Sequence, residues 1–342
     1  MSKKIVEKKS ETNKQESPSK RNLYIYGFPS RYGGAGTELH HQIYVLKDIP
    51  WLKLSIIPTN AGWPNEPLLK EMQGLGIDIC PANEFSLLTS DDAIINFCSS
   101  EFLKNLPAII RHTKRTIFVN CMTWLFDSEK LMHSSNNIAF SLYQRDQVRA
   151  DHEKTLRSIG SKAQFLTFTP YFRKNGFEFR QKDQEFTYLG RISRQDADKY
   201  AANTLHIYEY IVAPKWKRGI FLGFDQRSEQ KIGKLPSWIV GFADQNQLPV
   251  EKFYEMLDFI VQPTDTTENW PRIGMEAMAS GVPLVVDNRG GWQYMIEHGK
   301  NGFLCNNDRD FIYYGSRLAY DLELRGRIAR NAAKRLDKIA GY

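Results

Sequence analysis

The sequence predicts an α/β protein with two parallel sheets, one in each half of the chain. From about residue 22 onward, short apolar runs typical of buried parallel strands alternate with stretches of helical pattern. Turn signals rich in glycine or proline follow several of these runs. A chain of 342 residues with 42% hydrophobic content is long enough for two domains, each with its own core.

The first half, residues 22–180, is expected to form one domain. It begins with a strand over Leu23–Gly27, which leads through a glycine-rich turn into a helix over Leu39–Leu46. Further strands are expected at Leu54–Pro58, Ala93–Cys98, Thr116–Asn120, Ala139–Tyr143 and Phe165–Pro170, and helices at Leu68–Gly74 and Gln144–Gly160. Because no G-x-G-x-x-G follows the first strand, the pattern does not support a dinucleotide site.

The second half, residues 181–342, is expected to form the other domain. It opens with a strand in the segment Glu185–Arg194. Further strands are expected at Phe221–Phe224, Ile239–Phe242, Phe259–Pro263 and Leu284–Val286, with a helix at Pro249–Leu257. Strand, loop, helix and strand therefore alternate here as well, which is typical of a doubly wound sheet with functional loops at the carboxyl ends of its strands.

The positive charge is concentrated at the start of the chain. Residues 1–21 hold seven Lys or Arg against three Glu, which is +4 of the formal net charge of +7. This tail lacks aromatic residues and periodicity, so we expect it to be disordered. It would serve solubility, or a peripheral contact with an anionic surface.

The cysteines and the apolar runs exclude several classes of protein. Cys80, Cys98, Cys121 and Cys305 have neither metal-ligand nor disulfide-framework spacing. No apolar run is long enough to span a membrane, and no secretory leader is recognisable. We therefore expect a cytoplasmic protein with no metal, no cofactor and no integral membrane contact.

The most informative segment runs from Glu268 to Val286, E-N-W-P-R-I-G-M-E-A-M-A-S-G-V-P-L-V-V. It indicates an acidic loop, a short helical run that begins at Glu276, and a buried strand. The free N–H groups of a helix start favour a phosphate, and flanking carboxylates accept hydrogen bonds from sugar and ribose hydroxyls. Two glutamates at this spacing alone would indicate only a solvated helix face, but this neighbourhood suits a nucleotide-sugar.

With its flanks, this segment resembles a known family. P-T-D-T-T-E-N-W-P-R-I-G-M-E-A-M-A-S-G-V-P-L-V-V-D-N-R-G-G is similar to the donor-site motif of retaining glycosyltransferases of family 4, and I-E-H-G-K-N-G-F-L matches its usual continuation. The resemblance is strongest over residues 185–340. It implies the GT-B fold, two Rossmann-like domains facing across a cleft, and a retaining, metal-independent hexosyltransferase that uses a UDP- or GDP-linked sugar.

The resemblance also implies roles for individual residues. Glu268 would approach the hydroxyls of the donor sugar, and Glu276 would bind the ribose. Arg191, in the strand–Gly–Arg pattern, would contact the donor diphosphate with Lys199 as a second cation, and Arg194 competes for that second place. Cations fixed at the diphosphate oxygens stabilise the negative charge that develops as the sugar departs.

Further donor contacts follow from the same resemblance. They fall in the first glycine-rich loop, in the acidic loop and beside the nucleotide base: Gly33, Gly34, Gly36, Trp270, Arg272, Ile273, Gly274 and Phe242. Two interpretations stand for Arg272, contact with phosphate or bracing of the loop. Gly290 and Gly291 allow close packing beside the site or form a structural turn.

The acceptor side departs from the family pattern. Many relatives carry a histidine after the strand that ends here at Val119, where this chain has Asn120, whose amide cannot carry a proton. Asn120, Thr123 and His40 are the candidates for contacts with the acceptor or the sugar. Asp196 and Asp198 form a D-x-D pattern, which we interpret as two solvated loop charges rather than as a metal site.

Three functions remain open at this point. A glycan or glycoconjugate is the expected acceptor. Transfer to a modified base of DNA is the alternative, with the aromatic and basic runs 171–174 and 215–218 as candidates for stacking and phosphate contact. A non-catalytic nucleotide-sugar-binding relic is the third.

Overall fold

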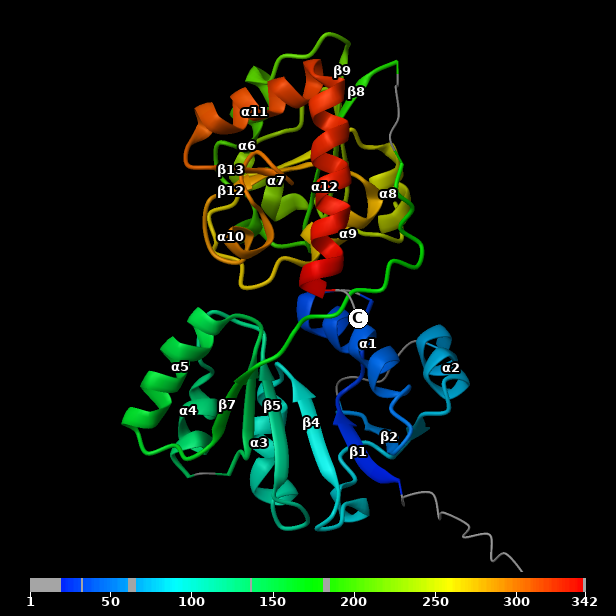
Figure 1. The fold of residues 1–342 in the computed structure, drawn as a ribbon, viewed down its shortest axis with the longest axis vertical. Helices are drawn as coiled ribbons and strands as arrows, with labels where there is room; N and C mark the ends of the chain where they lie inside the picture. The colour runs from blue at the N-terminus through cyan, green and yellow to red at the C-terminus, as the bar shows by residue number, and fades with distance from the viewer. Residues whose placement is uncertain (1–19, 32, 61–65, 136, 181–184, 341–342) are drawn as a thin grey trace, which may run out of the picture.

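The structure is a computed structural model that describes residues 20–31, 33–60, 66–135, 137–180 and 185–340. All but the last two residues of the expected tail lie outside these ranges. The chain forms two lobes, each built on a parallel sheet (Figure 1). We call them the amino-terminal lobe and the carboxyl-terminal lobe. The expected fold class, two doubly wound α/β sheets, is confirmed.

The sheet of the amino-terminal lobe has the strand order β3-β2-β1-β4-β5-β6-β7. Its strands are β1 (Arg21–Tyr26), β2 (Leu52–Ile57), β3 (Asp78–Ile79), β4 (Ala93–Phe97), β5 (Arg115–Asn120), β6 (Phe140–Tyr143) and β7 (Gln164–Thr167). Its helices are α1 (Gly34–Leu46), α2 (Glu66–Gly74), α3 (Ser100–Ile109), α4 (Asp127–Ser134) and α5 (Asp146–Ser158). Every expected strand is present, whereas β3, α3 and α4 were not predicted.

The sheet of the carboxyl-terminal lobe has the order β10-β9-β8-β11-β12-β13. Its strands are β8 (Thr187–Ile192), β9 (Lys217–Leu222), β10 (Ile239–Phe242), β11 (Phe259–Gln262), β12 (Leu284–Asp287) and β13 (Phe303–Cys305). Its helices are α6 (Thr204–Tyr210), α7 (Gln226–Ile232), α8 (Val250–Met256), α9 (Arg272–Ser280), α10 (Trp292–Met295), α11 (Asp308–Tyr320) and α12 (Leu322–Ala340).

One expected boundary is wrong. The helix predicted to begin at Glu276 begins at Arg272, one turn earlier. Pro271 precedes the first helical residue, and its ring fixes a φ of −70° that suits a helix entrance. Glu276 therefore lies inside α9, while the free N–H groups of the helix start still lie between Glu268 and Glu276.

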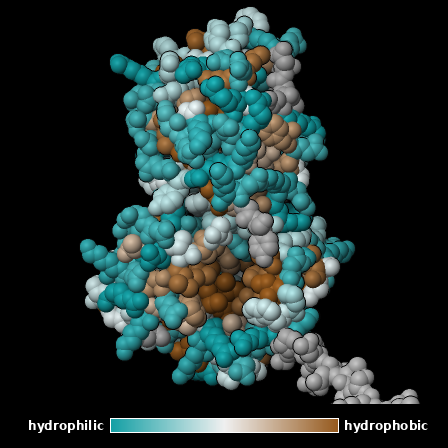
Figure 2. Space-filling view, viewed as in Figure 1, coloured by the Kyte–Doolittle hydropathy of each residue, from teal (hydrophilic) through white to brown (hydrophobic). Residues whose placement is uncertain are grey.

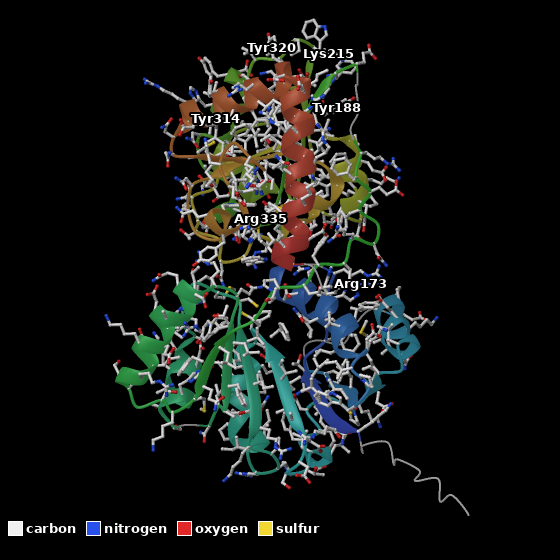
Figure 3. The ribbon with its side chains drawn as sticks, viewed as in Figure 1. Arg173, Tyr188, Lys215, Tyr314, Tyr320 and Arg335 are labelled. Atoms are coloured by element: carbon white, nitrogen blue, oxygen red, sulfur yellow. The ribbon has the colours of Figure 1, made fainter. Side chains whose placement is uncertain are left out.

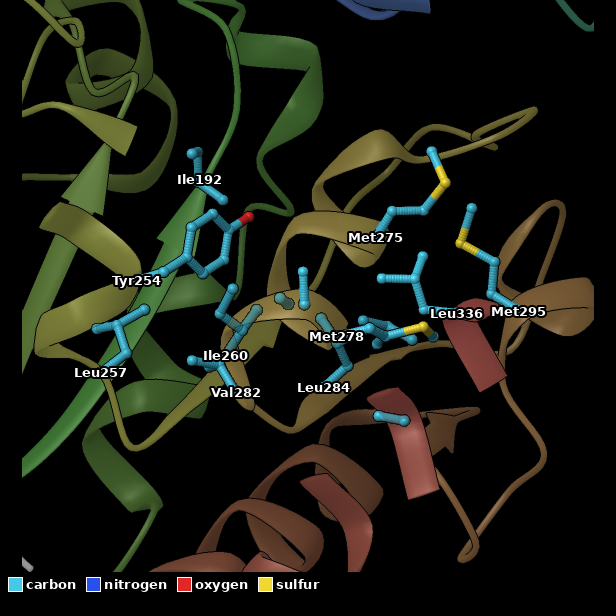
Figure 4. Close-up of a cluster of buried hydrophobic side chains, with 14 of the residues drawn as sticks. Ile192, Tyr254, Leu257, Ile260, Met275, Met278, Val282, Leu284, Met295 and Leu336 are labelled. Atoms are coloured by element: carbon cyan, nitrogen blue, oxygen red, sulfur yellow. The ribbon is translucent and has the colours of Figure 1, made fainter. Parts of the chain in front are cut away.

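Buried side chains fix α9 against its neighbours (Figure 4). Met275 and Met278 of α9 belong to one apolar cluster with Met295 of α10 and Leu336 of α12. Fully burying such a side chain contributes about 1.5–3 kcal/mol. The position of the α9 start is thus set by the core of the carboxyl-terminal lobe.

The chain crosses between the lobes near residue 172, where α12 also ends. The backbone N–H of Phe172 donates to the carbonyl oxygen of Ala340 at 3.1 Å, and Lys174 pairs with Asp337 at 2.5 Å. Arg173, labelled in Figure 3, lies beside α1 with its guanidinium 3.3 Å from the centre of the Tyr44 ring. The crossing segment is therefore bound to both lobes.

Brown side chains gather in a hollow of the amino-terminal lobe, over β4 and β5 (Figure 2). Phe97, Ile117 and Leu142 are partly buried on the α1 side of this sheet, and Leu166 is 47% exposed. Helices α3 and α5 pack in clusters on the other side. In the described part of the chain, no helix has the length and apolar character needed to cross a membrane.

Candidate functional site

The acidic loop between β11 and α9 meets the turn that follows β8. Lys199 ends that turn, and its Nζ donates to Oε1 of Glu268 at 2.7 Å. The two side chains are 20% and 25% exposed, so both reach solvent. The contact follows from the pairing of β8 with β11, because parallel neighbours end at the same edge of the sheet. The predicted residues Glu268 and Lys199 are therefore brought together.

Glu276 lies one turn into α9, beneath Tyr254 of α8. The Tyr254 hydroxyl donates to Oε2 of Glu276 at 3.0 Å and also lies 3.0 Å from the carbonyl oxygen of Ile273. Burial raises the pKa of Glu276, while the charge of Arg272 and the hydrogen bond from Tyr254 oppose that shift. Tyr254, which no sequence pattern singled out, thus orients the predicted ribose-binding carboxyl.

The loop after β12 supports the acidic loop through its backbone. Gly290 has a φ of +58°, and a Cβ there would lie 2.4 Å from the carbonyl oxygen of Glu268. A Cβ at Gly291 would lie 2.1 Å from the carbonyl oxygen of Asn269, and the N–H of Gly291 donates to the carbonyl oxygen of Glu268 at 2.8 Å. Both glycines are therefore required by close approach.

Two helix starts without side-chain caps lie on opposite sides of the lobe junction. They are the start of α1, preceded by Gly33, and the start of α9, preceded by Pro271. A buried ion pair links them, since Nη1 of Arg272 donates to Oε2 of Glu38, four residues into α1. The first N–H groups of a helix lack intrahelical partners and attract anions.

The ion pair settles how Arg272 is used in this conformation. Its Nη2 donates to the carbonyl oxygen of Tyr171 at 3.2 Å, so two of its three nitrogens hold the amino-terminal lobe. Glu38 in turn accepts from Gln42 at 2.7 Å and from the backbone of Tyr171 at 3.0 Å. Arg272 braces the two lobes rather than extending toward solvent.

The predicted glycines lie at the start of α1. Gly33 has a φ of +78°, and a Cβ at Gly36 would lie 2.7 Å from Cβ of Ser30. Gly34 is exposed, with open space around it. The ion pair between Glu38 and Arg272 places this turn beside the start of α9.

Arg191 lies beneath the surface of the carboxyl-terminal lobe. Its guanidinium stacks 3.3 Å from the centre of the Tyr200 ring, and Nη2 donates to the carbonyl oxygen of Lys199 at 2.5 Å. The other two nitrogens are buried without a hydrogen-bond partner. The structure thus places Arg191 next to the Lys199 backbone but closed off from solvent.

The remaining predicted donor residues surround the same edge. Arg194 is exposed and pairs with Asp196 at 3.0 Å. Asp196 also accepts from the backbone N–H of Asp198, so it caps the turn that ends at Lys199. Phe242 ends β10, Trp270 places its indole N–H 3.5 Å from the sulfur of Met275, and Gly274 packs against Trp292.

The acceptor candidates are engaged within the amino-terminal lobe. The amide of Asn120 donates to Glu129 at 3.0 Å and accepts from the backbone of Met122 at 2.7 Å. His40 pairs with Glu71 at 2.8 Å, and burial lowers the pKa of its imidazole. The carbonyl oxygen of Thr123 lies 3.3 Å from a ring nitrogen of His152. These groups hold their own loops in the described conformation.

A second contact between the lobes involves two residues that were not predicted. Nε of Arg145, directly before α5, donates to Oδ1 of Asn269 at 2.9 Å. The amide nitrogen of Asn269 donates to the carbonyl oxygen of Cys121 at 3.0 Å. Asn269, adjacent to Glu268, thus contacts the loops after β5 and β6.

The two aromatic and basic runs considered for nucleic acid are not brought together. Trp216 is 84% exposed, but it directly precedes β9, at the edge of the sheet opposite the acidic loop. Lys217 donates to the carbonyl oxygen of Tyr208 at 2.9 Å. Phe172 is buried and stacks on His41 at the lobe junction.

The family comparison matches part of the carboxyl-terminal lobe, and curated relatives match about a third of the chain or less. Residues 239–335 match the family model described as glycosyl transferases group 1. Spore coat protein SA of Bacillus subtilis (strain 168) is 30% identical over 106 residues, 30% of this chain and 28% of that protein. The uncharacterized glycosyltransferase MJ1607 of Methanocaldococcus jannaschii is 34% identical over 97 residues, 28% of this chain and 24% of that protein. The matches span less than a third of each curated relative.

Comparison with solved structures covers nearly the whole chain. Anabaena Alr3699/HepE in complex with UDP-glucose has a TM-score of 0.69 at 15% identity, covering 93% of this chain and 95% of that chain. A glycosyltransferase from Rickettsia africae ESF-5 has a TM-score of 0.70 at 16% identity, covering 94% and 95%. At these identities the likeness is one of fold. The chain therefore has the GT-B fold, and its residues 239–335 match the glycosyl transferases group 1.

Proposed function

We propose that the protein is a retaining glycosyltransferase that moves a hexose-type sugar from a nucleoside diphosphate sugar to a hydroxyl of a glycan or glycoconjugate. The observation that carries the proposal is the pair of Lys199 and Glu268 at the entrance to α9, with Glu276 one turn further on. One cation and two carboxylates thus surround a helix start that offers free N–H groups.

Each part has a chemical task in this proposal. The N–H groups at the starts of α1 and α9 and the ammonium of Lys199 bind the diphosphate and stabilise its charge as the glycosidic bond breaks. Glu268 accepts hydrogen bonds from the donor sugar, and Glu276 accepts them from the ribose. A leaving phosphate oxygen takes the proton of the incoming hydroxyl on the same face, so the step requires no protein nucleophile.

Arg191 is part of this proposal, but its buried position limits how it can act. A buried guanidinium that lacks two partners is costly, and an approaching phosphate would supply them. The side chain must leave its stacked position on Tyr200 to reach the donor, or act from beneath by orienting the Lys199 backbone. We propose the second role, because its Nη2 already donates to that backbone.

UDP is the first nucleotide to test. The fold is similar to that of Anabaena Alr3699/HepE, whose structure was solved with UDP-glucose. GDP is the second, because the resemblance to the family allows a UDP- or a GDP-linked donor. A glycan is favoured over DNA because the exposed Trp216 lies at the far edge of the sheet from Glu268.

Nucleotide binding and donor turnover test the proposal separately. We expect UDP or GDP to raise the melting temperature, and UDP-glucose or GDP-mannose to be consumed with release of the nucleotide. Glu276→Ala should weaken nucleotide binding, and Glu268→Gln should lower turnover by about 100-fold or more while the nucleotide still binds. Glu66→Gln, an exposed glutamate at the start of α2, is the matched control.

Three outcomes separate the alternatives. Nucleotide binding without turnover of any donor, across a panel of acceptors, would favour the non-catalytic relic. Transfer to DNA but to no glycan would favour the nucleic-acid alternative. Absence of a melting-temperature shift with UDP, GDP and ADP would contradict both the enzyme and the binding protein.

A further inference from the structure

Arg145 is a buried cation without a carboxylate partner at the lobe junction. Only 8% of the residue is exposed. Among the described residues its guanidinium makes one hydrogen bond, from Nε to Asn269. Arg272, the other buried arginine at this junction, pairs with Glu38, whereas Arg191, buried in the carboxyl-terminal lobe, has no ion-pair partner among the described residues. Arg145 therefore differs from Arg272 in lacking an ion-pair partner.

The two terminal nitrogens of this guanidinium have no protein partner. Nη1 and Nη2 make no hydrogen bond with the described residues, and neither is fully shielded from solvent, although the residue as a whole is only 8% exposed. Burial lowers the pKa of Arg145, but an arginine remains protonated at working pH. Both Nη groups are thus free to donate to a ligand at the junction.

The surroundings hold this group in place and add positive potential. Arg145 directly precedes α5, a helix of 13 residues whose start has no side-chain cap. The ring of Tyr294 lies 5.4 Å from the guanidinium carbon. Arg335 of α12, labelled in Figure 3, donates to the carbonyl oxygens of Tyr294 and Met295 and so holds the backbone that carries that ring.

The carboxylates in the first two turns of α5 have other hydrogen-bond partners. Asp146, the next residue, accepts from the hydroxyl of Thr167 at 2.6 Å and lies 3.7 Å from Arg149. Asp151, one turn further along α5, accepts from Gln147 at 2.9 Å. Neither carboxylate is hydrogen-bonded to Arg145, although the charge of Asp151 partly offsets the lowering of its pKa by burial.

We propose that Arg145 binds an anionic group of the acceptor, a phosphate or a carboxylate carried by a sugar. The proposal rests on the proposed function and names the class of its acceptor. Arg145 belongs to the amino-terminal lobe and contacts Asn269, the neighbour of Glu268, so an acceptor held there lies beside the donor sugar. A planar guanidinium whose two Nη groups have no partner among the described residues suits bidentate contact with either anion.

The test compares anionic sugars with their neutral counterparts. The acceptors are glucose, glucose 6-phosphate, glucose 1-phosphate and glucuronate, with the donor that the wild type consumes. We expect at least one anionic sugar to have a higher kcat/KM than glucose. In Arg145→Gln the ratio of anionic to neutral kcat/KM should fall about 10- to 100-fold, because a charge-assisted hydrogen bond is lost. Comparison of the two glucose phosphates with glucuronate shows whether the preferred anionic group is a phosphate or a carboxylate.

The ratio separates binding of an anion from support of the acidic loop. If Arg145 only braces Asn269, its loss lowers the rates with both kinds of acceptor and leaves the ratio unchanged. Arg149→Gln is the matched control, because it makes the same charge change on the same helix at a guanidinium already paired with Glu153. We expect this control to keep the wild-type ratio.

Binding measured by calorimetry makes the proposal independent of turnover. The wild type should bind the preferred anionic sugar more tightly than glucose, and Arg145→Gln should lose that preference. Equal binding of anionic and neutral sugars by the wild type would overturn the proposal, as would duplex DNA as the only anionic ligand. Failure to bind or consume any donor overturns the proposed function instead, and the sugar titrations still decide whether Arg145 binds an anion.

Discussion

The two lobes share one plan but fix their junction loops by different means. In the carboxyl-terminal lobe, the acidic loop packs backbone against backbone on Gly290 and Gly291. In the amino-terminal lobe, side chains fix the loops instead. Asn120 holds its loop through Glu129 and Met122, and His40 is held by Glu71. The first arrangement leaves the polar side chains Glu268 and Lys199 at the surface. In the second arrangement, the polar side chains of the loops, such as Asn120 and His40, are used for internal contacts.

The difference explains why the sequence resembles a family more strongly in one half than in the other. A loop fixed by glycines and main-chain hydrogen bonds requires particular residues at particular positions. A loop fixed by side chains accepts other combinations that fill the same hydrogen bonds. We therefore expect the amino-terminal lobe to vary more between relatives.

Breaking the ion pair between the lobes should have the largest effect. Glu38→Gln leaves the buried charge of Arg272 without its partner, and we expect the free energy of unfolding to fall by about 3–5 kcal/mol, measured by denaturant titration. Glu38→Gln with Arg272→Met removes both charges and should recover much of that loss. Lys70→Gln, which breaks an exposed pair with Glu66, should cost less than about 1 kcal/mol.

Additive losses in the double variant would contradict this interpretation, because coupled partners give a non-additive cycle. Loss of stability without a change in nucleotide affinity would show that the pair supports the fold alone. We expect both quantities to change, since the pair also holds the starts of α1 and α9 together.

Gly291→Ala should act next most strongly, and on the carboxyl-terminal lobe alone. Its Cβ would lie 2.1 Å from the carbonyl oxygen of Asn269, so the acidic loop must move. We expect a cost of about 1–3 kcal/mol and a loss of nucleotide affinity, measured by thermal unfolding and by titration with UDP. Gly74→Ala, with open space around the new methyl group, should do neither. Unchanged UDP affinity in Gly291→Ala would show that the loop does not depend on this packing.

The smallest expected effect concerns the pH dependence of nucleotide binding. Burial raises the pKa of Glu276, so we expect its charge, and with it the proposed contact with the ribose, to be lost as the pH falls through that raised value. Protonation over the same range stabilises the unliganded protein, because the folded pKa exceeds the unfolded one. Tyr254→Phe removes a hydrogen bond that lowers this pKa.

In Tyr254→Phe the pH midpoint of UDP affinity should therefore move upward, by less than about one unit, since a hydrogen bond contributes about 1 kcal/mol. Isothermal titrations across a pH series measure it. Tyr313→Phe, an exposed tyrosine of α11, is the control. An identical pH midpoint of UDP affinity in the wild type and in Tyr254→Phe would contradict a role for Glu276 in ribose binding.

Much of the fold could be predicted because its strands are buried on both faces. Apolar runs such as Phe259–Val261 therefore mark strands directly, and the strand predicted at Phe259–Pro263 is observed at Phe259–Gln262. Helix α3 was missed although Ser99 caps it and apolar residues recur along it, because Pro107 interrupts the pattern. The start of α9 was misplaced because Pro271 carries no capping side chain.

The contacts across the junction could not be predicted from local sequence patterns. Glu38 and Arg272 are 234 positions apart, and Arg145 and Asn269 are 124 apart. Nothing in the neighbourhood of either residue specifies its partner. The sequence could propose that Arg272 acts as a brace, but only the packed lobes identify what it holds.

The end of α12 has a mechanical consequence. Ala340 is bonded to Phe172, and Arg272 to the adjacent Tyr171, so the ion pair with Glu38 lies close to the point where the lobes are tied. If the lobes rotate about this point, the hydrogen bond between Arg145 and Asn269 is the one that breaks and re-forms, because it is not part of this tie. A fluorophore pair placed across α5 and α10 would then follow substrate entry, while one across α1 and α9 would stay nearly still.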